Sequence, residues 1–320
     1  MLSRVADSLY WMSRYMERAE NDARILDVNL QLLLDLGGEA DAMQHWAPVI
    51  ATLEETDLFD SLYQTADERS VTEFLTLQKK NPNSIISCLT LARENARTTR
   101  EQISSEMWEE INRLYLFVQS DEAAGMLESS PHEFFKAVIT GSHLFQGISD
   151  ATMTHGEGWD FIRIGRLLER ADSSSRILDV KYHILLPTGE NVGGNIDTIQ
   201  WMGVLKSCSA LEAYCKLYVS QVKPWKVAEF LITHQEFPRS IRFCVDSLDA
   251  ALHRISGVDE SRYANEAERL SGRLRSDLDY VTIGEIFEFG LHEYLTQIQE
   301  RLVEVSNAMY ATYCASLSAA

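Results

Sequence analysis

One segment of this chain occurs twice, and its repetition restricts the possible folds more than any other feature. Residues 14–28 read RYMERAENDARILDV and residues 166–180 read RLLERADSSSRILDV, so nine of the fifteen positions are identical. The first copy lies within a stripe of apolar residues, spaced three and four apart, that runs from Leu2 to Leu33. This spacing predicts one long helix of about nine turns with a single buried face.

Three other pairs of segments follow the first pair in the same order. The pairs are Trp46-x-x-Val49 with Trp201-x-x-Val204, VTEFLTLQKKNPNSIISC (71–88) with VAEFLITHQEFPRSIRFC (227–244), and His132-Glu133-Phe134 with His292-Glu293-Tyr294. The offset between partners grows only from 152 to 160 residues along the chain, as small loop insertions would cause. The ordered set indicates an internal duplication. We expect a first helical repeat at 1–155 and a second at 156–320.

Helix-start signals are frequent in this sequence, whereas chain breakers are rare. The 320 residues include 6 prolines and 16 glycines, which favours long helices. Four segments fit capping boxes, namely Ser70-x-x-Glu73, Ser130-Pro131-x-Glu133, Thr154-x-x-Glu157 and Thr282-x-x-Glu285. We find no alternating strand pattern. We therefore expect an all-α fold: two internally duplicated helical bundles packed as one pseudo-twofold unit, each closed by a long helix, at 131–155 and 283–313.

The chain is strongly acidic, with a formal net charge of −19 and an isoelectric point near 4.8. Such a surface repels nucleic-acid phosphates and anionic lipid, so neither a nucleic acid nor a membrane is an expected partner. The five cysteines include no C-x-x-C pair, and we interpret them as small buried residues in a reducing compartment. The N-terminus is not signal-like and no run approaches about 18 apolar residues, so we expect a cytoplasmic protein.

The two copies of the repeated helix share charged residues as well as leucines. The shared charges are Arg14, Glu17, Arg18 and Arg24 in the first copy, and Arg166, Glu169, Arg170 and Arg176 in the second. In the first copy Arg14, Glu17, Arg18, Asn21 and Arg24 are linked by spacings of three, four and seven residues, so we expect them to share one face of the helix, away from the apolar stripe. Neighbouring positions differ, because Asn21-Asp22 becomes Ser173-Ser174. We interpret these two neighbours as surface positions that have drifted.

Three interpretations of the shared charges remain open. In the first, they form a structural Arg–Glu network at the junction of the halves, where each arginine must keep its carboxylate because an unpaired buried charge costs several kcal/mol. In the second, they bind an anion or a partner. In the third, they are solvated ion pairs worth about 0.2–0.5 kcal/mol each. The first interpretation predicts that the two copies meet near a pseudo-twofold axis and pair reciprocally, with Glu17 and Glu169 buried.

A second group of charges lies in ARENARTTREQISSEMWEEIN (92–112), where the duplication fails. We expect Arg93, Arg97 and Arg100 to share one helical face. Either they pair within the helix, with Glu94 and Glu101 both in reach of Arg97, or they line a cleft for a carboxylate, a phosphate or an acidic peptide end. The candidate residues for such a cleft, with Trp108 as its apolar wall, are Arg93, Asn95, Arg97, Arg100, Glu101 and Trp108.

The sequence contains none of the common catalytic or metal-binding motifs. No Glu-x-x-His of a di-iron bundle, H-E-x-x-H, P-loop, G-x-G-x-x-G or G-x-S-x-G occurs. We therefore expect no metal and no cofactor. His132-Glu133 and its counterpart His292-Glu293 resemble a functional dyad, but helix capping by Glu133 explains the first of them better. Cys88 and Cys244 follow an apolar pattern typical of a core.

Several segments resemble the alpha-E family, a bacterial all-helical domain named for a Glu-Arg motif. The segments are 1–27, 81–115, GWDFIRIGRLLERADSSSRILDV (158–180) and EFPRSIRFC (236–244). In this resemblance the motif falls on Glu17-Arg18 and Glu169-Arg170. The resemblance implies association with an ATP-grasp-type amide ligase and a transglutaminase-like protease, in peptide or amide-bond synthesis or modification.

These observations lead to three functional hypotheses. The first is a non-catalytic helical scaffold or partner protein that acts with an ATP-grasp-type ligase and a transglutaminase-like protein, and that binds a peptide or a carboxylate. The second is an enzyme of amide-bond formation or transfer that uses the Arg93–Trp108 segment and the Glu-Arg network. The third is a purely structural homo-oligomer.

Overall fold

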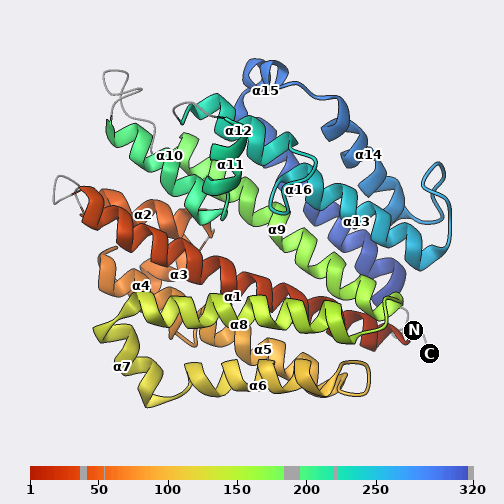
Figure 1. The fold of residues 1–320 in the computed structure, drawn as a ribbon, viewed down its shortest axis with the longest axis horizontal. Coiled ribbons are helices and arrows are strands. Elements are labelled where there is room, and N and C mark those ends of the chain that lie inside the picture. The colour runs from red at the N-terminus through yellow and green to blue at the C-terminus, as the bar shows by residue number, and fades with distance from the viewer. Residues whose placement is uncertain (37–41, 54, 184–194, 219–221, 316–320) are drawn as a thin grey trace.

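A computed structural model describes residues 1–36, 42–53, 55–183, 195–218 and 222–315 (Figure 1). Within these ranges the protein consists of helices and connecting turns, without a strand, so the all-α prediction is confirmed. The first half contains α1 (Ser3–Leu36), α2 (Ala42–Thr52), α3 (Thr56–Leu62), α4 (Glu68–Thr76), α5 (Ile85–Thr98), α6 (Ser105–Val118), α7 (Asp121–Ser129) and α8 (Pro131–Thr152).

The second half begins with another long helix. It contains α9 (Glu157–His183), α10 (Asn195–Ser207), α11 (Leu211–Leu217), α12 (Pro224–Thr233), α13 (Ile241–Ser256), α14 (Glu266–Tyr280), α15 (Ile283–Phe289), α16 (Leu291–Met309) and a π-helical turn at Tyr310–Cys314. The boundary expected at 155/156 falls in the short connection between α8 and α9. No helix within the described part of the chain is long and apolar enough to cross a membrane.

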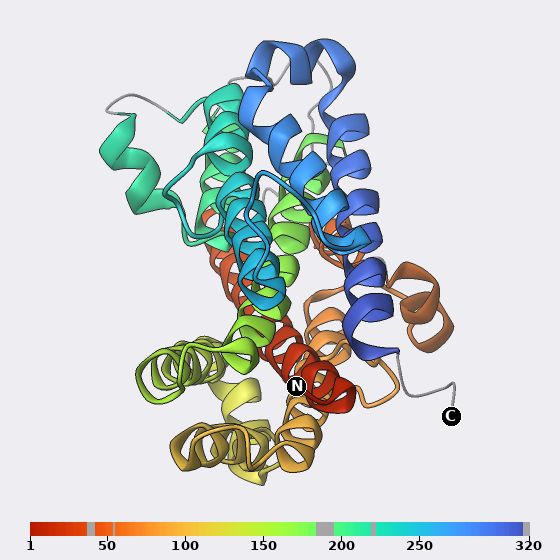
Figure 2. The same cartoon turned by 90° about the vertical axis from the view of Figure 1, so that its right-hand side faces the viewer.

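Helices α1 and α9 lie side by side through the centre of the molecule. Both views place α5–α8 on one side of this pair and α12–α16 on the other (Figures 1 and 2). Helix α1 packs against α5 and α8, and α9 packs in the same way against α13 and α16. In addition, α2 reaches across to α9, and α10 reaches across to α1. The two halves therefore interlock instead of meeting at a flat surface.

The predicted apolar stripe explains why α1 is central. Leu9, Met12, Met16, Ala19 and Leu26 are all buried. Burial of a large apolar side chain contributes about 1.5–3 kcal/mol, so this stripe stabilises the helix through packing more than through helix propensity.

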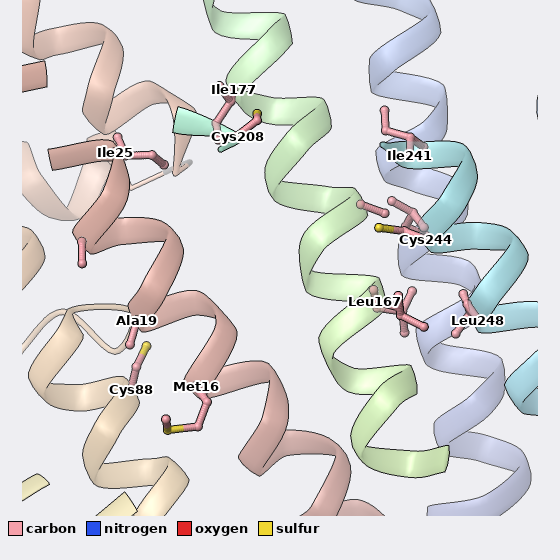
Figure 3. Packing of buried hydrophobic residues seen from close by; sticks show 14 of the residues in the cluster. Met16, Ala19, Ile25, Cys88, Leu167, Ile177, Cys208, Ile241, Cys244 and Leu248 are labelled. Carbon is pink, nitrogen blue, oxygen red and sulfur yellow. The ribbon is translucent and has the colours of Figure 1, made fainter. Parts of the chain in front are cut away.

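The cysteines mostly behave as core residues. Figure 3 shows Cys88 of α5 beside Ala19 of α1, and Cys244 of α13 close to Leu167 of α9. Cys88 and Cys244 are buried, so their interpretation as core residues is confirmed. The interpretation fails for Cys215, which is exposed on the short helix α11.

A glycine sets the closest approach of the two central helices. A Cβ atom at Gly165 of α9 would overlap the carbonyl oxygen of Tyr10 on α1. Only a residue without a side chain allows the two backbones to come this near. The approach brings the charged residues of both helices, one or more turns further along, within reach of each other.

Two predicted helix boundaries are wrong. Helix α4 begins at Glu68 instead of following Ser70, because Asp67 is the N-cap and forms the capping box with Ser70. The closing helix expected at 283–313 is broken at Gly290, whose φ of 111° only glycine adopts readily. By contrast, the capping box of Thr282 with Glu285 is confirmed.

Candidate functional site

Charged side chains cross the interface between α1 and α9. Glu17 is 1% exposed and Glu169 is 5% exposed. Nε of Arg170 lies 2.7 Å from Oε1 of Glu17, and Nε of Arg18 lies 2.6 Å from Oε1 of Glu169. Arg14 adds a second ion pair to Glu169 at 2.8 Å. Each buried glutamate is therefore held by arginine from the other copy of the repeated helix.

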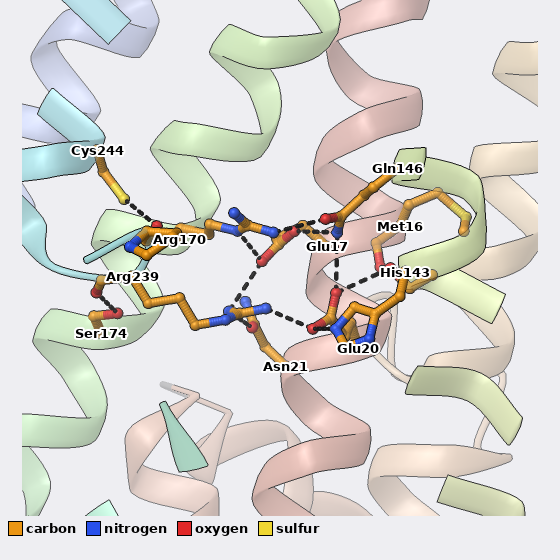
Figure 4. A network of polar contacts seen from close by, with 12 residues as sticks. Met16, Glu17, Glu20, Asn21, His143, Gln146, Arg170, Ser174, Arg239 and Cys244 are labelled. Atoms are coloured by element: carbon orange, nitrogen blue, oxygen red, sulfur yellow. Dashed lines mark hydrogen bonds and ion pairs between the residues drawn. The ribbon is translucent and has the colours of Figure 1, made fainter. Parts of the chain in front are cut away.

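On one side of this interface, Arg239 completes a group that we name the closed cluster (Figure 4). It consists of Glu17, Glu20, Asn21, Arg24, His143, Gln146, Arg170 and Arg239. The guanidinium of Arg239 lies 3.0 Å from Glu17, 2.5 Å from Glu20 and 2.8 Å from Oδ1 of Asn21.

Glu20 is the centre of the closed cluster. Burial alone would raise the pKa of its carboxyl, but Arg239, His143 and Arg24 outweigh burial and hold that pKa well below its usual range. Ser142 donates a further hydrogen bond to Glu20 at 3.1 Å. Neither Glu20 nor Arg239 is among the site residues predicted from the sequence, although both lie inside the repeated segments.

On the other side of the interface, the charged residues line a cavity of about 350 Å³. Its wall contains Trp11, Arg14, Arg18, Asn21, Asp22, Asn83, Glu169, Asp172, Ser173 and Arg176, and the end of α2 and one face of α16 complete it. The predicted charges are thus divided: Arg14, Arg18, Glu169 and Arg176 face the cavity, whereas Glu17, Arg24 and Arg170 belong to the closed cluster.

Glu169 is ionised in the wall of this cavity. Burial raises the pKa of a carboxyl, but Arg18 and Arg14 outweigh it and lower the pKa of Glu169 to about 2. Burial by itself would lower the pKa values of these arginines, and Glu169 raises them above the usual value. Arg18 also donates through Nη1 to Asn83, which lies two residues before α5. These groups satisfy one another.

Asp22 behaves differently from every carboxylate named above. It is 1% exposed, and neither of its oxygens has a hydrogen-bond partner among the residues that the structure describes. Burial raises the pKa of its carboxyl well above the usual value, and Arg18 opposes this only in part. Oδ1 of Asp172 is likewise buried without a partner in the described ranges.

Asp22 is absent from the site residues predicted from the sequence for an identifiable reason. The interpretation of the change from Asn21-Asp22 to Ser173-Ser174 as drift at the surface is wrong, because Asn21, Asp22 and Ser174 are all buried. The difference between the copies was itself the signal. It occurs where one side of the interface is closed and the other contains a cavity.

Arg166 stays outside the pairing pattern. Burial and the nearby Arg170 lower the pKa of its guanidinium to about 10. Its buried Nε has no hydrogen-bond partner among the described residues. Arg14, its counterpart in the first copy, pairs with Glu169.

The segment 92–112 forms a separate, self-paired group. Nε of Arg93 donates to Asn112 at 2.8 Å, and Nε of Arg97 donates to Glu94 at 2.9 Å. The guanidiniums of Arg93 and Arg100 lie over the ring of Trp108, at 5.5 and 5.0 Å. This arrangement matches the interpretation as internal pairing.

The expected common helical face of this segment is wrong for its last arginine. Helix α5 ends at Thr98, so Arg100 and Glu101 lie in the turn that follows, and only Arg93, Asn95 and Arg97 are on the helix. The amide of Asn95 donates to the backbone oxygen of Leu91 at 3.0 Å.

Two histidines make matching contacts that the sequence analysis did not predict. Nδ1 of His132 lies 2.7 Å from Oδ1 of Asp27, and Nδ1 of His292 lies 2.7 Å from Oδ1 of Asp179.

The capping explanation for Glu133 is wrong, since Ser130 makes no side-chain cap at the start of α8. Across the described ranges, no cluster of three or more His, Cys, Asp or Glu side chains could hold a metal ion.

Comparisons with known proteins agree with the Glu-Arg motif at Glu17-Arg18 and Glu169-Arg170. The model of the Alpha-E family, a predicted α-helical domain with a conserved ER motif, matches residues 1–314. Uncharacterized protein Mb2597 of Mycobacterium bovis and Uncharacterized protein Rv2567 of Mycobacterium tuberculosis are each 26% identical over 337 residues, which cover 98% of this chain. The chain spans 37% of the length of these relatives. No solved structure matches it. Because the family model covers nearly every residue, the chain belongs to the Alpha-E family.

Proposed function

We propose that this chain is a non-catalytic binding module whose cavity between α1 and α9 receives a small polar ligand. The observation that carries this proposal is the buried carboxylate of Asp22 in the cavity wall, without a partner among the described residues. A buried unsatisfied polar group costs about 1–3 kcal/mol, so folding alone gives no reason to retain it. Proteins keep such groups mainly where they bind or react.

The cavity has a suitable size and position for this role. Its volume of about 350 Å³ lies in the range of small-molecule sites. Its charged walls come from the two central helices, which the core holds rigidly, and the exposed side chains of Val303 and Asn307 on α16 lie at its rim. A rigid wall with unused polar groups is what a selective site requires.

We propose further that the two halves are duplicated bundles related by a pseudo-twofold axis, with the site at their junction. The matching neighbours of α1 and α9, the reciprocal pairs of Glu17 and Glu169, and the paired contacts of His132 and His292 support this. A duplicated frame with one closed and one open side would arise if one copy of an original site had been filled by an arginine.

The module acts, in this proposal, beside an ATP-grasp-type ligase and a transglutaminase-like protein in peptide or amide-bond chemistry. The family resemblance of the Glu-Arg segments supports the association. The greater length of the relatives, of which this chain spans 37%, is compatible with further domains beside this one. The cavity would hold a substrate group for the partner enzyme.

Native mass spectrometry of the protein purified from its own cells tests ligand binding. We expect a bound small molecule in the wild type, released on denaturation, and a reduced amount in Asp22→Asn. Affinity purification of the tagged chain should recover a ligase-like protein in the same preparation. Repeated isolation of a ligand-free chain that also recovers no ligase would overturn the proposal.

One observation favours catalysis at the same cavity as a second candidate. A buried carboxyl with a raised pKa, near Arg18, has the properties of a general acid in amide-bond formation or transfer. If so, Asp22→Asn should retain the ligand but abolish product formation in a reconstituted mixture with the ligase. Arg97→Ala, in the self-paired segment, should leave product formation unchanged. If Asp22→Asn instead loses both the ligand and product formation, the binding module is favoured.

A further inference from the structure

The two sides of the α1–α9 interface differ at one equivalent position. Arg239 directly precedes Ser240, the N-cap of α13, and Asn83 directly precedes Ser84, the N-cap of α5. Both residues therefore enter the interface from the same kind of loop, on opposite sides. Arg239 is long enough to place its guanidinium in the closed cluster, whereas Asn83 is short and lies in the wall of the cavity.

The contacts of Arg239 define a site for a guanidinium. Its nitrogens meet Glu17, Glu20 and Asn21. The residues at the same positions of α9, 152 residues later, are Glu169, Asp172 and Ser173. All three line the cavity, as does Asn83. The cavity thus occupies the place that, on the opposite side, the side chain of Arg239 fills.

The unused hydrogen-bonding capacity of the cavity is mostly that of acceptors. Both oxygens of Asp22 and Oδ1 of Asp172 are buried and without a partner in the described part of the chain. All three guanidinium nitrogens of Arg18 donate to Glu169 or Asn83, and Nε of Arg176 donates to Oδ2 of Asp172 at 2.8 Å. One donor in the wall, Nδ2 of Asn21, is also buried without a partner among the described residues. A bound group that donates several hydrogen bonds and carries positive charge would satisfy the three remaining carboxylate oxygens.

We propose that this cavity binds a ligand bearing a guanidinium or a primary ammonium group, seated against Asp172 as Arg239 is seated against its counterpart Glu20, with Asp22 as the second carboxylate. Both groups supply several N–H donors on one positive charge, which is what the unpaired oxygens of Asp22 and Asp172 require. This inference rests on the proposed binding function and names the class of its ligand.

Isothermal titration calorimetry with four probes tests the ligand class. Agmatine presents a guanidinium and an ammonium group, 1,5-diaminopentane presents two ammonium groups, N-butylurea is a neutral analogue of an alkylguanidinium, and succinate is an anion. We expect one molecule of agmatine or of the diamine to bind, and N-butylurea and succinate to bind at least about tenfold more weakly. Preferential binding of succinate would overturn the proposal.

Substitution at position 83 provides the sharpest variant, because an arginine there reproduces the role that Arg239 has in the closed cluster. Asn83→Arg should place a guanidinium in the cavity and abolish agmatine binding, with a melting temperature that confirms folding. Asp22→Asn should weaken agmatine binding about tenfold to a hundredfold without filling the cavity. Gln102→Arg adds the same charge in an exposed turn and should leave binding unchanged. Wild-type affinity in both Asn83→Arg and Asp22→Asn would contradict the inference.

The reverse substitution gives an independent readout. Arg239→Asn should open an equivalent space beside Glu17 and Glu20, lower the melting temperature and allow agmatine to restore part of the loss. Arg269→Asn, which removes a surface pair with Glu266, serves as its control and should show no such rescue. Absence of rescue in Arg239→Asn, in a variant that still folds, would count against the equivalence of the two sides.

These results separate the inference from the proposed function. A native ligand that proves anionic, and that Asn83→Arg displaces, would leave the binding module intact and refute the cationic class. Failure of all probes, together with a ligand-free native protein, would refute both.

Discussion

At the scale of single residues, two buried acids in one cavity wall have opposite protonation behaviour. Glu169 meets two arginines from α1, which lower the pKa of its carboxyl to about 2 in spite of its burial. Asp22 lies one helical turn beyond Arg18 on α1, but its oxygens make no hydrogen bond within the described ranges, so burial dominates and raises its pKa. The difference comes from the nearby charges first and from hydrogen bonds second, since both side chains are almost equally buried: two arginines lower the pKa of Glu169, whereas at Asp22 the charges of Glu169 and Glu55 oppose Arg18.

Replacing Glu169→Gln should lower the free energy of unfolding by about 3–5 kcal/mol at pH 7, because Arg14 and Arg18 would be left without their carboxylate. The stability that ionised Glu169 gives the wild-type protein is complete above pH 4.5, the ordinary pKa of a glutamate, and is lost as the pH falls toward the folded-state pKa of about 2. Urea unfolding should therefore show a difference between variant and wild type that narrows below pH 4.5. Glu266→Gln, which removes an exposed ion pair with Arg269, is the control and should show no such pH dependence. A stability difference between Glu169→Gln and wild type that stays constant below pH 4.5 would contradict this account.

Replacing Asp22→Asn should stabilise the ligand-free protein at pH 8 by about 1–3 kcal/mol. The folded state holds the proton of this acid more tightly than the unfolded chain does, so wild-type stability falls as pH rises above the ordinary value of 3.8. The neutral amide that replaces the carboxyl does not titrate, so the variant keeps its stability as the pH rises. Its excess stability over the wild type should therefore shrink as the pH is lowered toward 4. Denaturant titrations at pH 8, 6 and 4 measure the free energy of unfolding of both proteins. A destabilised variant at pH 8 would show that Asp22 is ionised and satisfied.

At the scale of helices, the contact between α1 and α9 depends on the small residue Gly165. Helix propensity alone favours alanine over glycine by about 1 kcal/mol in a helix interior. At this position a Cβ atom would overlap the backbone of Tyr10, so tertiary packing reverses the preference. The break at Gly290 has a different cause, because its φ of 111° lies where glycine is favoured and ends one helix before the next begins.

Gly165→Ala should therefore destabilise the protein by about 1–3 kcal/mol, as overpacking does. The matched control is Gly147→Ala in α8, where the added methyl group meets nothing within 4 Å and should stabilise by up to about 1 kcal/mol. Thermal unfolding of both variants measures the contrast. Equal effects of the two substitutions would mean that the helices can separate without cost.

At the scale of the whole molecule, one hydrophobic core extends through both halves. The buried cluster includes Leu9 and Met16 of α1 together with Leu167 of α9 and Leu248 of α13. The ion pairs of Glu17 and Glu169 also join the halves. Each half therefore lacks part of the surface and charge that it needs to fold alone.

Expressed separately, fragments 1–155 and 156–320 should each lack a cooperative thermal transition, because each exposes one long apolar helix face and one unpaired glutamate. Co-expression should restore a single transition near that of the intact chain. Circular dichroism and differential scanning calorimetry measure this outcome. A fragment that unfolds cooperatively at the temperature of the full chain would show that the halves are independent domains.

From the sequence alone, the helical fold and the central role of α1 could be predicted, because a spacing of three and four residues places side chains on one face regardless of what covers them. The same spacing predicted that Glu17 and Glu169 share a face with arginines. Helix boundaries at Asp67 and Gly290 were missed, since helix capping and a positive φ depend on local geometry that several residue patterns fit equally well.

Only the tertiary structure decided which side of the junction is closed and which contains the cavity. That difference depends on the reach of Arg239 compared with Asn83, two residues far from α1 in the sequence, and on the distance between helix backbones at Gly165. It also decided that Asp22 is buried without a partner, which no residue pattern within α1 contains. Periodicity determines the faces of a helix, whereas the packing of distant segments determines what each face meets.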